Sequence, residues 1–251
     1  MEIRFEEPTP NIGLITIDQP PRYNAMTREM LADVAGLWDT LEYSHHRCVV
    51  VTGAGEKAFT SGADVSADLS ASPEQAAVIN RALLKTSTFS KPIIAAVNGV
   101  CAGGGVELLL ATDIRIAAPH ARFGLPEVKW SIYPFGGATI KLIQQIGYVQ
   151  AMDLLLTGRM VDAAFAQSIG LINRIVPADE LLAHCLETAE MIAANSPSAV
   201  QAVKRQISNT IAAHAKAREP LDQALGDEVR AGPHFDEGVA AFREKRRPNY
   251  T

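Results

Sequence analysis

The sequence has little cysteine, and none of it is arranged as a metal site or a disulfide framework. Among 251 residues only Cys48, Cys101 and Cys185 are present, an odd number spread far apart and outside any C-x-x-C pattern. This usage is typical of a reducing compartment and predicts that no metal is bound. We therefore expect a cytoplasmic protein.

The sequence also lacks an excess of basic residues, a signal peptide and an uninterrupted apolar run. The formal net charge is −5, which gives no electrostatic signature of nucleic-acid binding. The first seven residues have no apolar core of the kind that secretory signals carry. The longest apolar region, residues 92–118, is interrupted by Asn98, Glu107, Asp113 and Arg115. We therefore expect neither a nucleic-acid partner nor a membrane span.

Motifs of several common enzyme classes are absent. The chain has no G-x-G-x-x-G dinucleotide fingerprint, no P-loop and no G-x-S-x-G nucleophile elbow. None of the six histidines stands in a recognisable motif, and the neighbouring His45 and His46 are expected at the surface. A Ser-His-Asp hydrolase therefore finds no support.

The most informative stretch that is present runs from Asn98 to Glu107. Residues 92–97 form an uncharged apolar run that predicts a buried strand, and an apolar helix is expected from Val106. The three glycines 103–105 at the junction are consistent with a tight turn. Glycine also lets a backbone approach a ligand, and a helix N-terminus offers unpaired N–H groups. Glu107 interrupts the apolar helix, where an ionised carboxylate is costly unless it is paired or used.

Further residues could complete a site around this junction. Glu127 follows a proline in a predicted loop, and two carboxylates are the minimum equipment for acid–base chemistry on water. An isolated glutamate in a loop is more commonly just solvated. The chain that leaves a predicted strand at Gly62 could present the N–H of Ala63. Together with the N–H of Gly104, that group would form an oxyanion hole with two donors.

Strand and helix patterns alternate up to about residue 177, and only helical patterns follow. This order predicts an α/β fold with a core over residues 1–195 and a helical C-terminal region over residues 196–251. A weak strand–strand–helix recurrence runs through the first half. We expect a helix from a capping box at Ser72 to about Phe89 and a strand over residues 171–176. Breaks between C-terminal helices are expected at Pro197, Pro220 and Pro233.

Four motifs follow one another along the chain, namely Phe59–Asp64, Pro92–Gly99, Gly103–Glu107 and Phe123–Glu127. Together they resemble the enoyl-CoA hydratase (crotonase) family, and the similarity extends to Glu237–Arg246 near the C-terminus. The resemblance implies a ClpP/crotonase-like spiral of ββα units followed by a helical trimerisation region. It also implies an acyl-CoA substrate and assembly as a homotrimer or as a homohexamer built from two trimers.

The resemblance also implies roles for individual residues. Ala63 and Gly104 match the oxyanion-hole amides. Glu107 and Glu127 match the two glutamates of the hydratases, of which the first helps to activate water and the second exchanges a proton at C2. Substrate or CoA contacts are implied for Arg22, Tyr23, Ala25, Ala63, Asp64, Val65, Ser66, Gly104, Phe242 and Lys245. The alternative to a CoA contact for the basic run 243–247 is a solvated helix face, and the two interpretations are equally favoured.

The chain departs from the family pattern just after the second glutamate. Ser131 stands where the family commonly has glycine, and residues 134–138 replace a Pro-Gly-x-Gly-Gly-like turn. Trp130, Tyr133 and Phe135 are expected to line the acyl pocket. Their bulk favours a short, branched or functionalised acyl group, as in carnitinyl-CoA-type dehydratases, over a straight long chain. The alternative is that these side chains only pack beneath the active-site loop.

The resemblance implies hydration of the C2=C3 double bond of a 2-enoyl-CoA thioester, or the reverse dehydration. The thioester oxygen would lie between the two amides while a water held by the two glutamates adds to C3. The resemblance also implies that no metal or redox cofactor is needed, and that CoA is part of the substrate rather than a prosthetic group. An enoyl-CoA isomerase, another thioester-enolate enzyme of this fold and, more remotely, a non-enzymatic RNA-binding relative are alternatives.

Overall fold

Two β-sheets frame the structure, a computed structural model that describes residues 1–64 and 72–251. The larger sheet has six strands in the order β1 (Glu2–Thr9), β2 (Ile12–Asp18), β3 (Cys48–Gly53), β5 (Ile93–Val97), β7 (Ile114–Ala117) and β10 (Arg174–Ile175). The smaller sheet has four, in the order β4 (Ala58–Thr60), β6 (Val100–Ala102), β8 (Arg122–Gly124) and β9 (Val161–Asp162). Neighbouring strands are parallel except in the pairs β1–β2 and β8–β9.

The chain alternates between the two sheets in a repeating pattern. The strands β3, β5 and β7 belong to the larger sheet, and each is followed by a strand of the smaller sheet and then by a helix. This arrangement confirms the predicted spiral of ββα units. Because successive units stack, the strands β4, β6 and β8 lie side by side, and so do the segments that follow them.

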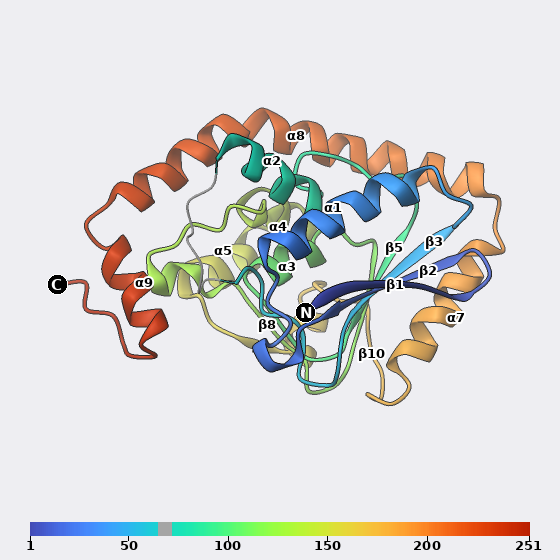
Figure 1. Ribbon diagram of the computed structural model, residues 1–251, viewed down its shortest axis with the longest axis horizontal. Helices are drawn as coiled ribbons and strands as arrows, with labels where there is room; N and C mark the ends of the chain where they lie inside the picture. The colour runs from blue at the N-terminus through green and yellow to red at the C-terminus, as the bar shows by residue number, and fades with distance from the viewer. Residues whose placement is uncertain (65–71) are drawn as a thin grey trace.

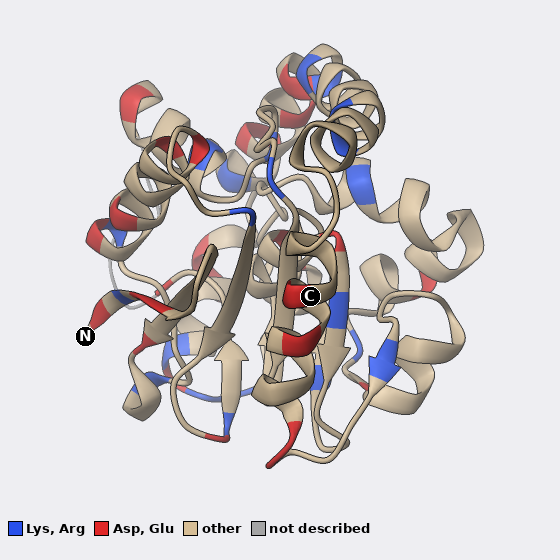
Figure 2. Cartoon of the chain, turned by 90° about the vertical axis from the view of Figure 1, so that its right-hand side faces the viewer, with Lys and Arg blue, Asp and Glu red and all other residues tan. Residues whose placement is uncertain are grey.

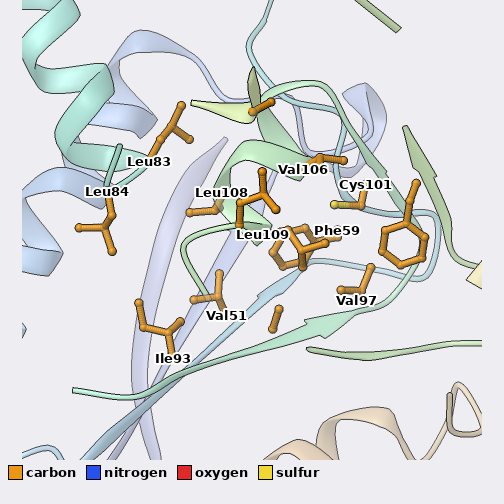
Figure 3. Packing of buried hydrophobic residues seen from close by; sticks show 14 of the residues in the cluster. Val51, Phe59, Leu83, Leu84, Ile93, Val97, Cys101, Val106, Leu108 and Leu109 are labelled. Atoms are coloured by element: carbon orange, nitrogen blue, oxygen red, sulfur yellow. The ribbon is translucent and has the colours of Figure 1, made fainter. Parts of the chain in front are cut away.

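The larger sheet is buried on both faces, as expected of a parallel sheet covered by helices. Alternate residues of its strands belong to two separate apolar clusters, one on each face. The first cluster includes the apolar side of α3 (Gly104–Leu109), and Figure 3 shows Leu109 beside Phe59. The second cluster is covered by α7 (Leu181–Ala193). The short helix that carries Glu107 is therefore anchored in the core.

Helices cover the sheets and make up the C-terminal part of the chain. The longest, α8 (Pro197–Ala231), crosses above α1 (Arg28–Glu42) and α2 (Pro73–Ala82) in the view of Figure 1, and α9 (Phe235–Arg243) turns back from its end. The remaining helical elements are η1 (Pro20–Arg22), η2 (Pro126–Trp130), α4 (Ala138–Ile146), α5 (Tyr148–Thr157) and α6 (Ala163–Ser168).

The helix that follows Ser72 is shorter than predicted. It begins with the predicted capping box, but it ends at Ala82 rather than near Phe89. Leu84 has a left-handed backbone conformation with a φ of 46°, which the helix cannot continue through. The predicted strand over residues 171–176 is likewise reduced to the two residues of β10.

Pro220 lies inside α8, so the predicted break at this residue is wrong. Proline in a helix interior removes one hydrogen bond and costs about 3 kcal/mol. Its neighbours Glu219 and Asp222 form ion pairs with Lys85, and these contacts stabilise the helix at this point. The described residues beyond position 178 contain no strand, which confirms the predicted change from mixed to helical structure.

Among the described residues, no helix combines the length and apolar character needed to cross a bilayer. Figure 2 shows Lys and Arg interspersed with Asp and Glu over the elements in view. This view therefore gives no sign of the single-signed basic face that nucleic-acid binding requires.

Candidate active site

The junction between β6 and α3 depends on its three glycines. Gly103 has a left-handed φ of 55°, which favours glycine, and its N–H donates to the carbonyl of Gly124 at 3.0 Å. Gly105 packs against β4 so closely that a Cβ would stand 2.3 Å from the carbonyl oxygen of Thr60. The helix α3 begins at Gly104, two residues earlier than predicted. The glycines thus serve close packing and also start the helix at the site.

Two backbone N–H groups lie next to one another at this junction. A Cβ on Gly104 would stand 3.4 Å from the amide nitrogen of Ala63. The N–H of Gly104 is the first of α3 and has no acceptor within the helix. Ala63 pairs with Met26 through the carbonyl of Gly62 and the N–H of Asp64, so its own N–H faces the other way. Neither N–H donates to any described residue, and both are therefore free to act as oxyanion-hole donors.

Glu107 is buried on the first turn of α3, with 4% of its surface exposed. Its Oε1 accepts a hydrogen bond from the N–H of Ala138 at 3.3 Å, and a Cβ on Gly136 would stand 2.2 Å from its Oε2. Burial raises the pKa of Glu107 above the usual value, although the Ala138 N–H and the charge of Lys85 favour the carboxylate. This carboxyl group therefore holds a proton more readily than an exposed one.

Glu127 belongs to the 3-10 helix η2 rather than to the predicted loop. Its Oε1 lies against the glycine junction, since a Cβ on Gly103 would stand 3.2 Å away. Its Oε2 is enclosed and has no hydrogen-bond partner among the described residues. Burial raises the pKa of Glu127, and the charge of Glu107 raises it further. The charge of Glu107 therefore acts on Glu127, and burial makes both carboxyl groups hold a proton more readily than exposed ones.

The N-terminal segment expected to hold CoA runs beside the chain that carries the first amide donor. The N–H of Ser61 donates to the carbonyl of Tyr23 at 3.0 Å, and Arg22 forms an ion pair with Asp64. Tyr23 is exposed, whereas Ala25 is buried. The structure therefore brings these residues together next to the amide pair. The other two residues of this predicted group, Val65 and Ser66, lie outside the described residues.

Comparison with known proteins identifies the family to which this geometry belongs. The sequence model of the enoyl-CoA hydratase/isomerase family matches residues 7–251. The chain belongs to this family. The crotonase fold is therefore confirmed, and the protein is an enzyme of the hydratase/isomerase type.

Several relatives are similar over nearly the whole chain. Identity to the enoyl-CoA hydratase EchA19 of Mycobacterium tuberculosis is 40% over 245 residues, which covers 94% of this chain and 92% of the relative. Identity to the mevalonyl-coenzyme A hydratase sidH of Aspergillus fumigatus is 36%, which covers 97% of this chain and 92% of the relative. A solved structure of a carnitinyl-CoA dehydratase from Mycobacterium avium has a TM-score of 0.90 at 32% identity. The match covers 99% of this chain and 98% of that structure's chain.

The aromatic residues that follow the second glutamate contact the C-terminal helices. The ring of Trp130 lies 5.2 Å from that of Phe242 in α9. The hydroxyl of Tyr133 donates to Asp222 of α8 at 2.7 Å, and Phe135 also packs against α8. In this enoyl-CoA hydratase/isomerase family member, the wall beside the glutamates is therefore built partly from the C-terminal helices. The acyl-pocket role of these three residues stays a prediction.

The predicted C-terminal CoA contacts lie at the end of α9. Phe242 is exposed on one side and rests on Trp130 on the other, and Lys245 is exposed with a left-handed φ of 55°. In the basic run, Arg246 forms ion pairs with Glu237 and Glu244, both at 2.6 Å, but α9 ends at Arg243, so residues 244–247 are not a helix face. Contact of Phe242 and Lys245 with CoA stays a prediction.

A buried ionic group near Glu107 escapes prediction from the sequence. The Nζ of Lys85 lies 2.6 Å from Oδ2 of Asp222 and 2.8 Å from Oε2 of Glu219, both on α8. Lys85 is 1% exposed and Asp222 is 3% exposed. A lysine placed directly after two leucines, at positions 83 and 84, is the one local signal of this group, because its partners are far away in the sequence.

His45 and His46 differ in environment, so the expectation that both lie at the surface is wrong for His46. His45 is exposed and its Nε2 is hydrogen-bonded to Glu7 at 3.0 Å. His46 is buried, with its Nε2 3.6 Å from Oε2 of Glu7, and burial lowers its pKa. Within the described ranges these three side chains alone are grouped as a metal site would require. That the protein binds no metal remains a prediction.

Proposed function

We propose that the protein is an enoyl-CoA hydratase, which adds water across the C2=C3 bond of a 2-enoyl-CoA thioester or catalyses the reverse dehydration. The observation that supports this best is the enclosure of two glutamates, Glu107 and Glu127, beside two free amides. The names of relatives at 36–40% identity, enoyl-CoA hydratase and mevalonyl-coenzyme A hydratase, agree with it.

In this proposal the amides of Ala63 and Gly104 bind the thioester oxygen. Attack on C3 places negative charge on that oxygen as an enolate forms. Two N–H groups that already face this position stabilise the charge without rearrangement, and losing one such donor typically costs on the order of 100-fold in rate. The helix dipole of α3 adds a favourable field at the same place.

The two glutamates supply the base and the acid. Because burial raises both pKa values and the charge of Glu107 raises that of Glu127 further, the pair holds a proton at neutral pH. Glu107 accepts a proton from water as the water oxygen bonds to C3 and the C2=C3 π pair moves toward the thioester. Glu127 then delivers its proton to C2. The pair then holds one proton on Glu107, and Glu107 must release it and Glu127 regain one, through exchange with solvent, before the next hydration.

A short, branched or functionalised acyl group is part of the proposal. Trp130, Tyr133 and Phe135 add bulk to the wall beside the glutamates, which leaves less room for a straight long chain. The names of two relatives, mevalonyl-coenzyme A hydratase and carnitinyl-CoA dehydratase, indicate that those proteins act on acyl groups of this kind. CoA enters as part of the substrate and no separate cofactor is proposed. The cytoplasmic location also stays a prediction.

The second candidate function is isomerisation of a 3-enoyl-CoA to a 2-enoyl-CoA. This reaction needs only one base that moves a proton, so Glu107 would be dispensable. The enclosed position of both carboxyl groups favours hydration over this alternative.

Assembly as a homotrimer or homohexamer belongs to the same proposal. Val203 and Ile207 of α8 are 66% and 61% exposed, and they line an apolar groove of about 440 Å³. Exposed apolar surface of this kind marks contact sites. Sedimentation velocity is expected to show three or six copies, and a monomer at micromolar concentration would contradict this part of the proposal.

Labelled water separates the two candidate reactions. The purified protein is incubated with short, branched and polar 2-enoyl-CoA and 3-enoyl-CoA thioesters in water enriched in heavy oxygen. A hydratase transfers the labelled oxygen to C3 of a 2-enoyl-CoA. An isomerase converts the 3-enoyl-CoA without incorporating the label, and that result would replace the proposal.

A further inference from the structure

One carboxylate on α8 holds both ends of a segment that presses against Glu107. Oδ1 of Asp222 accepts hydrogen bonds from the hydroxyl of Tyr133 at 2.7 Å and from Oγ1 of Thr139 at 3.0 Å. Its Oδ2 accepts a hydrogen bond from Nζ of Lys85 at 2.6 Å. Both oxygens of this buried side chain are therefore used, and they join three elements that are far apart in the sequence.

The segment between Tyr133 and Thr139 contains two residues that lie against the carboxyl group of Glu107. Ala138 donates its N–H to Oε1 of Glu107 at 3.3 Å. Gly136 lies so close that a Cβ would stand 2.2 Å from Oε2. Any shift of this segment therefore moves the carboxylate or breaks its hydrogen bond. The ends of the segment are where such a shift can be prevented.

We propose that Asp222 is a positioning residue for the reaction, because by clamping Tyr133 and Thr139 it sets the place and orientation of Glu107. The inference rests on the proposed hydratase function. It gives α8 a role in catalysis beyond covering the core, and it gives Tyr133 a function in addition to any contact with the acyl group.

Lys85 stabilises the clamp, which is the pair of hydrogen bonds that Asp222 accepts from Tyr133 and Thr139. A buried carboxylate without a cation is costly, and Lys85 supplies the cation from a fully buried position. It also contacts Glu219 at 2.8 Å, outside hydrogen-bond geometry, while Asn80 donates to the other oxygen of Glu219 at 3.0 Å. The clamp is thus tied to the turn that follows α2 as well as to α8.

Several ionisable groups face Glu107 from the surrounding elements. These groups are Lys85, Asp222, Glu127, Tyr133 and Lys141. Loosening the segment weakens the Ala138 N–H bond, which favours the ionised form of Glu107. The titration of Glu107 therefore reports on the clamp separately from the rate of reaction.

The double variant Tyr133→Phe/Thr139→Val removes the two hydrogen bonds that this segment donates to Asp222 and keeps the side-chain volumes. We expect its kcat to fall at least tenfold with little change in KM, because a displacement of about 1 Å in a catalytic group can cost on the order of 100-fold. Tyr133→Phe/Thr139→Ser restores one of the two bonds and should recover part of the lost kcat. Asp227→Asn, at an exposed residue of α8, is the matched control and should keep wild-type kinetics.

The second readout does not depend on activity. The carboxyl carbon of Glu107, assigned with Glu107→Gln, is titrated by NMR in the wild type and in the double variant. We expect the midpoint to move to higher pH in the double variant and to stay in place in Asp227→Asn. If the double variant does not fold, Tyr133→Phe alone carries the same comparison.

The two proposals can fail separately. If the wild type hydrates no enoyl thioester, the proposed function fails, and the titration of Glu107 still decides whether the clamp acts on this carboxyl group. A folded double variant with an unchanged titration midpoint and unchanged kcat would overturn the positioning role of Asp222.

Discussion

Gly136 lies directly against the carboxylate of Glu107. A Cβ at this glycine would stand 2.2 Å from Oε2 of Glu107 and 2.6 Å from Cδ1 of Leu83, so either the carboxylate or the backbone must move. We expect Gly136→Ala to lower kcat on the order of 100-fold, because the displaced carboxylate no longer meets the water. Steady-state kinetics measure the effect. Gly36→Ala, where nothing lies within 4 Å, is the control, and equal activity of the two variants would contradict the position assigned to Glu107.

One methyl group can test the space between the two amides. A Cβ at Gly104 would stand 3.4 Å from the amide nitrogen of Ala63, an ordinary contact that the fold can tolerate. The same methyl group would lie beside the two amides, where we propose that the thioester oxygen binds. We expect Gly104→Ala to lower kcat/KM at least tenfold, since oxyanion stabilisation is lost. The melting temperature should change little. Full activity in this variant would place the thioester oxygen elsewhere.

Ser131 has a left-handed backbone conformation, with φ of 51° and ψ of 38°. This backbone conformation favours glycine, so serine is strained at this position. We expect Ser131→Gly to stabilise the protein by about 1 kcal/mol. For a chain of this size that corresponds to a rise in melting temperature of about 2–4 °C. Differential scanning calorimetry measures it, and a lower melting temperature would contradict the prediction.

The effect of Glu127→Gln on stability should depend on pH, with a sign that follows from burial. Because folding raises the pKa of this carboxyl group, the wild type loses stability as the pH rises from the pKa of the unfolded chain through that of the folded protein. A glutamine at this position does not ionise, so it causes no such loss of stability over this pH range. We expect the free energy of unfolding of the variant, relative to wild type, to increase by about 1 kcal/mol or more between about pH 5 and pH 9. Urea unfolding measures the difference, and a difference that does not vary with pH would argue that Glu127 is solvated.

Local patterns were sufficient to predict the buried strand and the glycine junction of the candidate site. The apolar run 92–97, the glycines 103–105 and Glu107 occupy one continuous stretch, so this candidate site is visible without knowledge of the fold. The capping box at Ser72 is equally local, because its two hydrogen bonds join residues three positions apart. Such features are set by short-range sterics and hydrogen bonding.

Long-range contacts could not be predicted in the same way. Lys85 and Asp222 are 137 positions apart, and no periodicity in the sequence connects them. The continuity of α8 through Pro220 also depends on such contacts, because the ion pairs of Glu219 and Asp222 with Lys85 compensate for a residue that usually ends a helix. The burial of His46 depends on its place in the fold rather than on its neighbours in the sequence.

The rate of crotonyl-CoA hydration tests the central proposal most directly. It is followed as loss of the conjugated enoyl-thioester absorbance for the wild type, Glu107→Gln and Glu127→Gln, with circular dichroism to confirm that each protein is folded. We predict rapid hydration by the wild type and a decrease in rate on the order of 100-fold or more in each variant. Glu107→Gln removes the proposed base, and Glu127→Gln removes the proposed acid. Hydration at a near-wild-type rate by either folded variant would contradict the assignment of the two glutamates as the acid–base pair.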